Sequence, residues 1–249
     1  GPWNHVATRG KGTSSVGEIE FGPEIDWGDE IYNRLRLSWF DRWLKDTDSD
    51  NDQEKPVRIF VMGGGDGEID PNGHIRHGGK WREEDAWPLA RAVESSLYLT
   101  EGGALSDSPD EGGAKSWTHD PAHPVPSISA NVTGLYEWVG IPDGLDDTYI
   151  PPRARMRSAI SDGPLHARER PDAIGASPPY GLLADRSDVN VFETEPLKTG
   201  LEVTGPIGVR LWVSSTALDT DFTARLLDIY PPTDEYPAGF HLPLADSIL

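Results

Sequence analysis

A chain of 249 residues with a formal net charge of −20 and no cysteine excludes several classes of protein. The negative charge repels nucleic acids and anionic membranes, so neither is expected as a partner. The absence of cysteine excludes disulfides, thiolate catalysis and cysteine-based zinc sites. No apolar run approaches the roughly 20 residues that cross a bilayer. We therefore expect a soluble protein, with the cytoplasm preferred as its compartment and homo-oligomerisation left open.

The segment 26–46, DWGDEIYNRLRLSWFDRWLKD, is the clearest predicted helix. Acidic residues near its start and Lys45 near its end suit the helix dipole. Apolar residues recur at helical spacing, which is typical of a face buried in a core. The members of this face are Ile31, Leu35, Trp39 and Trp43. We predict that they pack into the protein interior.

Two loops flank a predicted strand at 57–64, VRIFVMGG, whose continuous apolar run indicates burial on both faces, as inside an α/β sheet. The acidic loop 46–54 and the glycine-rich loop 63–81 each imitate a calcium-binding loop. The first lacks the sixth-position glycine, and the second has Pro71 there. His74 and His77 offer two metal ligands without a third at a diagnostic spacing. We expect solvated turns without metal or cofactor, and keep a calcium-stabilised protein as an alternative.

The rest of the chain shows short β-rich runs separated by turn residues. The predicted strands lie around 97–99, 188–197, 201–215 and 221–230. In the third run, apolar Val209, Leu211 and Val213 alternate with residues of the opposite face, which favours an antiparallel sandwich. The connection 101–187 is rich in proline and irregular. Its His119 and His123 are predicted to lie in a loop, because prolines interrupt any helix there.

The opening residues GPWNH place His5 two residues after a large apolar anchor, Trp3. A histidine in such a position is usually a hydrogen-bonded structural residue. The order that follows, however, is a glycine-containing loop, an amphipathic helix and an apolar strand. That order is typical of the last catalytic element of an α/β-hydrolase, whose triad runs Ser, then Asp or Glu, then His along the sequence.

Several segments, in order, resemble the cocaine esterase and X-Pro dipeptidyl-peptidase family of serine hydrolases. They are GPWNH, WFDRWLK, VRIFVMGG, THDPAHPVPS, DVNVFETEPL and the run from Val203 to Pro231. The resemblance implies an α/β-hydrolase domain with a helical cap, followed by a C-terminal jelly roll. It implies cleavage of small esters or X-Pro peptides through an acyl-enzyme, and it makes His5 the base of the triad. The sequence contains no Gly-x-Ser-x-Gly elbow, so the nucleophile and the triad Asp are expected upstream of Gly1.

These observations predict a mixed fold that is truncated at both ends. Residues 1–92 would be the C-terminal remnant of the catalytic domain, and 93–249 a partial galactose-binding-like jelly roll with the long connection 101–187. The parent would be an enzyme, whereas this chain alone would be inactive. The alternative is a non-catalytic jelly-roll module that binds carbohydrate or a protein partner. Trp138 and Trp212 are its candidate contacts, although core packing is the expectation for both.

Overall fold

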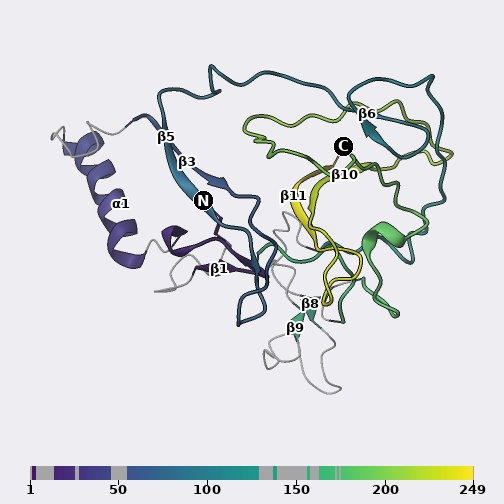
Figure 1. Cartoon of the computed structure of the whole chain (residues 1–249), viewed down its shortest axis with the longest axis horizontal. Coiled ribbons are helices and arrows are strands. Elements are labelled where there is room, and N and C mark those ends of the chain that lie inside the picture. The colour runs from purple at the N-terminus through teal and green to yellow at the C-terminus, as the bar shows by residue number, and fades with distance from the viewer. Residues whose placement is uncertain are drawn as a thin grey trace. The chain divides into compact units, whose positions relative to one another are not determined.

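The computed structural model of the chain describes residues 2–3, 14–25, 28–45, 55–128, 137–138, 156–157, 163–171, 173 and 175–248. The chain divides into two compact units, each made of two separate stretches. The first unit comprises Gly1–Glu94 and Thr199–Ser214, and the second comprises Ser95–Lys198 and Ser215–Leu249. Small sheets, mostly antiparallel, and few helices make up the described residues (Figure 1). The β-rich character expected from the sequence is therefore present.

The first unit contains two small sheets. In one, β1 (Ser15–Val16) pairs antiparallel with β2 (Ile19–Glu20), and β4 (Ile75–Arg76) joins β2 in parallel. In the other, β3 (Val57–Met62) and β5 (Gly79–Glu84) form an antiparallel pair. The predicted strand at 57–64 is therefore confirmed, but its burial on both faces is wrong. No residue of β3 is buried, and Met62 is 40% exposed.

The core of the first unit forms around β2 and β4. Its buried apolar side chains are Val16, Ile19, Phe21, Ile25, Ile75 and Leu89. Phe21 meets the ring of Phe60 edge-on at 6.2 Å, which connects the two sheets. Gly79 begins β5 with φ of +146°, and a Cβ there would lie 2.4 Å from the Phe60 ring. A side chain at position 79 would displace that aromatic contact.

The helix α1 (Gly28–Lys45) confirms the helix predicted at 26–46. Near its end, Lys45 pairs with Asp41 at 2.6 Å, one turn earlier. The predicted burial of its apolar face is wrong for the described structure, because Trp39 and Trp43 are 59% and 63% exposed. Their rings contact each other at 5.8 Å. The helical period correctly indicates an apolar face, but a period cannot specify what covers it.

The described residues of the second unit form three two-stranded antiparallel sheets. They are β6 (Tyr98–Leu99) with β7 (Leu105–Ser106), β8 (Glu137–Trp138) with β9 (Met156–Arg157), and β10 (Thr223–Ile229) with β11 (His241–Ile248). The last pair is the longest, and Figure 1 shows its two strands side by side. The register shifts between Leu226 and Leu227, where the partner changes from Ala245 to Pro243. Such a bulge accommodates a proline, which has no N–H for the ladder.

Two further predicted strands are absent from the described range 175–248. The segment 188–197 contributes a single bridge, between Glu193 and Ala104. The segment 201–215 contains no strand, and its Val209 and Val213 are exposed. An alternating pattern fits a pleated strand, yet a strand also needs a partner edge for its backbone hydrogen bonds. The prediction for 221–230 is confirmed by β10.

The core of the second unit lies beside β10 and β11. Phe240 and Leu242 are fully buried, and Tyr230 is nearly so. A second cluster consists of Ile128, Ala167 and Leu183, with Leu165, Ala173 and Leu227 packed against it. Leu183 begins the 3-10 turn η5 (Leu183–Asp185), and in the first unit Ile25 ends the 3-10 turn η2 (Pro23–Ile25). These contacts fix the loops that carry the polar groups described next.

Candidate functional site

The predicted catalytic residue, His5, lies outside the described residues, so its role stays a prediction. The structure does describe Trp3, two positions earlier. Its indole N–H donates a hydrogen bond to the carbonyl of Ile25 at 2.9 Å. Its ring lies 5.6 Å from that of Trp81, whose own N–H binds the carbonyl of Glu24 at 2.8 Å. Two indoles thus fasten the segment leading to His5 onto η2 and β5.

The glycine-rich loop 63–81 uses its acidic side chains internally. Asp66 and Glu68 both form ion pairs with Arg76. Asp70 accepts hydrogen bonds from the backbone N–H groups of His74 at 2.9 Å and Asn72 at 2.8 Å. The backbone N–H of His74 is the main cause that lowers the pKa of Asp70 to about 2. The oxygens that imitate a calcium loop are therefore engaged by protein donors.

The two histidines of this loop lie in different environments. His74 contacts Asp70 through Nδ1 at 3.2 Å, whereas His77 is buried with its ring edge-on to Phe21 at 5.7 Å. Across the described ranges, no three His, Asp or Glu side chains gather as a metal-binding group. Burial lowers the pKa of His77 from 6.5 to about 4. The neutral ring therefore supports the fold above pH 6.5, and that stability is lost as the pH falls toward 4.

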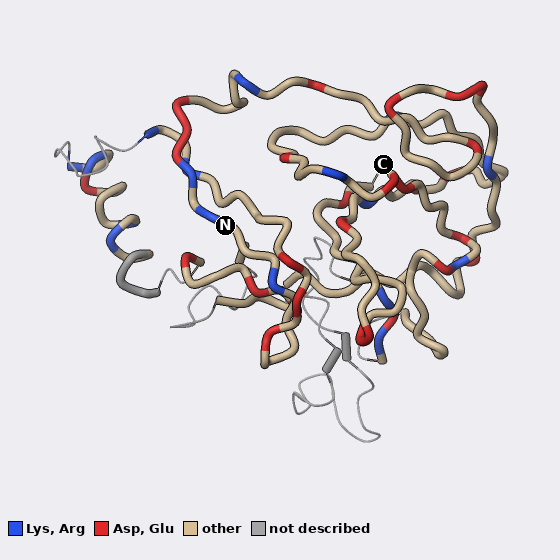
Figure 2. Tube along the Cα trace, viewed as in Figure 1, with Lys and Arg blue, Asp and Glu red and all other residues tan. Residues whose placement is uncertain are grey.

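A chain of ion pairs connects β5 with the second stretch of the first unit. Arg82 donates two hydrogen bonds to the carboxylate of Glu202, at 2.9 and 2.8 Å. It also contacts the buried Glu84. Arg91 binds both carboxylate oxygens of Glu84 with its two terminal nitrogens, Nη1 and Nη2. Arg91, followed by Arg82, lowers the pKa of Glu84 to about 2. Figure 2 shows acidic residues spread along the described chain, and the whole sequence has 42 Asp and Glu against 22 Lys and Arg.

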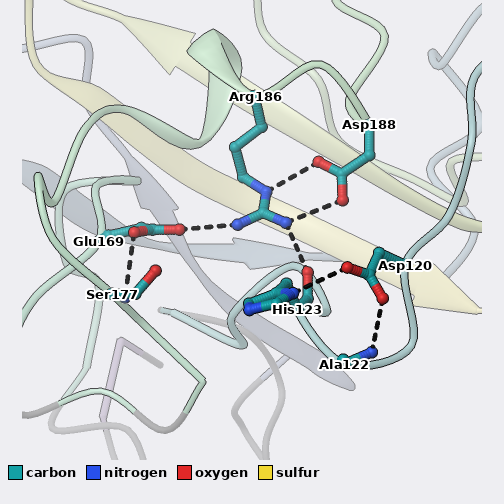
Figure 3. A network of polar contacts seen from close by, with 7 residues as sticks. All are labelled: Asp120, Ala122, His123, Glu169, Ser177, Arg186 and Asp188. Atoms are coloured by element: carbon teal, nitrogen blue, oxygen red, sulfur yellow. Dashed lines mark hydrogen bonds and ion pairs between the residues drawn. The ribbon is translucent and has the colours of Figure 1, made fainter.

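Arg186 is the centre of the polar network in Figure 3. It donates hydrogen bonds to Glu169 at 2.8 Å and to both oxygens of Asp188 at 2.8 Å. A further bond at 2.8 Å reaches the carbonyl of His123. The guanidinium lowers the pKa of Asp188, whose carboxylate in turn raises the pKa of Arg186. Glu169 is buried and also accepts the backbone N–H of Ser177 at 3.3 Å. One side chain thus joins three separate loops.

Removing this guanidinium is expected to destabilise the second unit. In Arg186→Met, Glu169 and Asp188 lose their positively charged partner, which should cost about 2–3 kcal/mol of unfolding free energy. Urea unfolding measures this loss. Arg210→Met, at an exposed position, is the control and should change stability by less than about 0.5 kcal/mol. An equal effect of both variants would show that the network contributes nothing specific.

His119 and His123 lie in a loop, as predicted. The segment from Asp120 to His123 is a turn, in which the ring Nδ1 of His123 lies 2.8 Å from Asp120. That histidine is the main cause that lowers the pKa of Asp120. Both side chains are exposed, and the carbonyl of His123 serves Arg186. The contacts of His123 therefore stabilise the turn at 120–123.

The tryptophans proposed as binding residues differ in what is described. Trp212 is 90% exposed, so its expected core packing is wrong. This exposure follows from the absence of a strand at 201–215, because without a paired strand the Trp212 ring has no sheet face to pack on. Trp138 belongs to β8, and its side chain lies outside what the structure describes.

Sequence reasoning missed the Arg186 network and a buried pair, His166 and His241. Arg186 and His123 are 63 positions apart in the sequence, and His166 and His241 are 75 positions apart. The acidic neighbours of Arg186 in DRSDVN were the one local signal for an ion pair. No local pattern indicates the histidine contact.

Comparison with known proteins supplies what the geometry alone does not. Residues 49–246 match the family model of the X-Pro dipeptidyl-peptidase C-terminal non-catalytic domain. The chain belongs to this family. It is also 31% identical over 242 residues to the cocaine esterase of Rhodococcus sp. (strain MB1 Bresler), an alignment that covers 93% of this chain and 33% of that protein. The resemblance stated from the sequence is therefore confirmed.

More distant relatives are named as serine esterases. Two such proteins, from Mycobacterium bovis and Mycobacterium tuberculosis, are each 24% identical over 233 residues, covering 93% of this chain and 28% of theirs. The chain thus spans about a third of the length of the curated relatives it matches. No solved structure matches it. The family consists of hydrolases, and the matched residues correspond to its non-catalytic part.

In the described residues, no helix is long and apolar enough to cross a membrane.

Proposed function

We propose that this chain is the C-terminal part of a serine hydrolase that cleaves small esters or X-Pro peptides through an acyl-enzyme. The observation that carries the proposal is the match of 198 consecutive positions, 49–246, to the C-terminal domain of X-Pro dipeptidyl-peptidases. The 31% identity to a cocaine esterase extends the argument to ester substrates. Because the match concerns a non-catalytic domain, the chemistry requires residues that this chain does not contain.

The catalytic domain would end within the first 92 residues, before a non-catalytic jelly roll at 93–249. The match to the non-catalytic domain starts earlier, at residue 49, and α1 precedes it. The exposed aromatic face of α1 supports this division. Its exposed apolar side chains are Leu37, Trp39, Phe40, Trp43 and Leu44. A contiguous apolar surface of this kind marks an interaction site on a soluble protein. In the proposal, the catalytic part of the parent protein covers it.

His5 would be the general base of the triad. As the serine attacks the substrate carbonyl, the imidazole takes the proton of its hydroxyl, and it then returns that proton to the leaving alcohol or amine. Water repeats the sequence to release the acyl group. The indole contacts of Trp3 support this role, since they hold the backbone just before His5 against the first unit. The triad serine and acid would come from sequence upstream of Gly1.

A chimera tests the proposal. The first two-thirds of the Rhodococcus cocaine esterase are joined to this chain, which replaces the matching third of that enzyme. The chimera is expected to hydrolyse a nitrophenyl ester or an X-Pro nitroanilide, whereas the 249-residue chain alone is expected to be inactive. Circular dichroism and gel filtration establish that both proteins are folded. A folded but inactive chimera, or hydrolysis by the isolated chain that depends on His5, would contradict the proposal.

The exposure of Trp212 favours one alternative, a non-catalytic module that binds carbohydrate or a protein partner. An exposed indole on a β-rich domain offers a flat apolar surface for a sugar ring or a partner side chain. This alternative predicts binding of the isolated chain to a glycan array, with at least about a tenfold loss in Trp212→Ala. Equal binding by both proteins, or none by either, would remove this support.

A further inference from the structure

Two buried histidines of the second unit lie in contact beside the start of β11. His166 and His241 are both buried, and their ring centroids are 5.7 Å apart. The ring of His166 stacks on Phe240 at 4.8 Å and 21°, and it meets the ring of Tyr236 edge-on at 5.3 Å. His166 is thus enclosed by aromatic rings and a second imidazole.

The hydrogen bonds decide which nitrogen of His166 accepts and which nitrogen of His241 donates. The backbone N–H of His241 donates to Nδ1 of His166 at 3.0 Å, so this nitrogen must carry a lone pair. His241 faces the carbonyl of Ala238 through Nε2 at 3.2 Å and must donate from that atom. The backbone N–H of Ala167 donates to the carbonyl of His241 at 2.9 Å. The first residue of β11 is therefore fastened to residues 166–167 by two bonds, one of which needs a neutral imidazole.

We propose that His166 and His241 form an acid-sensitive joint, which fastens the start of β11 to residues 166–167 at neutral pH and releases it in acid. A proton on Nδ1 of His166 removes the acceptor for the His241 N–H and places two donors face to face. It also puts a positive charge on a buried side chain, beside a second imidazole.

Burial and the neighbouring positive charges resist protonation of His166. Burial is the main cause that lowers its pKa from 6.5 to about 4, and the charges of His241 and Arg168 act in the same direction. The bond from the His241 N–H also favours the neutral ring, because only the neutral ring has a lone pair on Nδ1. Because the unfolded chain takes up this proton near pH 6.5, the joint is fully stable above that pH and weakens as the pH falls toward 4.

Nuclear magnetic resonance of the whole chain tests the joint at two levels. Imidazole nitrogen shifts should show His166 protonated on Nε2 alone at pH 7. Amide hydrogen exchange should show that protection of the His241 N–H falls by up to about tenfold per pH unit below pH 6.5, after correction for intrinsic exchange. Protection of the amides in β5 is followed in the same experiment. It reports the pH dependence of the first unit, where His77 also titrates, separately from that of β11.

The variant His166→Asn separates titration from packing. Its side-chain carbonyl can accept the His241 N–H bond but does not titrate, so the acid-dependent loss of protection at position 241 should disappear. His123→Asn, at an exposed histidine, should leave that loss unchanged. A wild-type His166 that carries its proton on Nδ1 at pH 7, or constant protection of His241 from pH 7 to 4, would overturn the proposal. These wild-type readouts decide the matter even if the variant does not fold.

Discussion

Replacing His5 with alanine is expected to lower kcat/KM of the chimeric enzyme on a nitrophenyl ester by about 10⁴-fold or more. Without the imidazole, the serine hydroxyl keeps its proton and remains a weak nucleophile. The loss should fall on kcat, because His5 acts on the proton in the transition state and not on binding of the acyl group. Steady-state kinetics, with the burst of nitrophenol release, measures both.

His119→Ala is the matched control for this experiment. His119 lies in an exposed loop and differs from His5 in its predicted role, so its removal should leave kcat within about twofold of the parent chimera. Thermal unfolding of both variants establishes that the chimera remains intact. A chimera that keeps full activity after His5→Ala would exclude the assignment of His5 as the base.

Phe240→Ala is expected to reduce the unfolding free energy by about 4 kcal/mol. The side chain is 1% exposed and contacts three other rings. It stacks on His166 at 4.8 Å and meets Tyr236 and Tyr230 edge-on at 5.1 and 6.5 Å. The truncation leaves a cavity that these rings cannot fill without moving the start of β11.

Urea unfolding measured by circular dichroism gives the size of the effect. Ile248→Ala, an exposed position at the far end of β11, serves as control and should cost less than about 1 kcal/mol. Phe240→Leu should fall between the two values, because it retains most of the apolar volume. If Phe240→Ala cost no more than Ile248→Ala, the ring cluster would not be the core of the second unit.

Local patterns predicted the elements whose formation depends on nearby residues. The helical period of 26–46 identified α1, and the apolar runs at 57–64 and 221–230 identified β3 and β10. The same patterns failed where a distant partner decides the outcome. Alternation at 201–215 predicted a strand, but without a neighbouring edge in the described structure the segment remains irregular. The exposure of Trp39 and Trp43 likewise depends on which other part of a protein packs against α1.

The polar sites divide in the same way. His5 could be proposed because the triad base follows a short motif at a definite place in the order of elements. The Asp120–His123 turn could be anticipated from prolines. Contacts between distant loops, such as Arg186 with His123 or His166 with His241, depend on the path of the chain and leave no trace in neighbouring residues.

The bidentate ion pair between Arg82 and Glu202 has a consequence for how the protein can be divided. It joins residues 120 positions apart within one unit, while most of the intervening chain belongs to the other. Because the two units are interleaved along the polypeptide, no single cut separates them. An excised piece starting at Ser95 would carry Glu202 without its arginine. The first unit must also close a loop of about a hundred residues, 95–198, before its two stretches meet, which makes its assembly an intrinsically slow step.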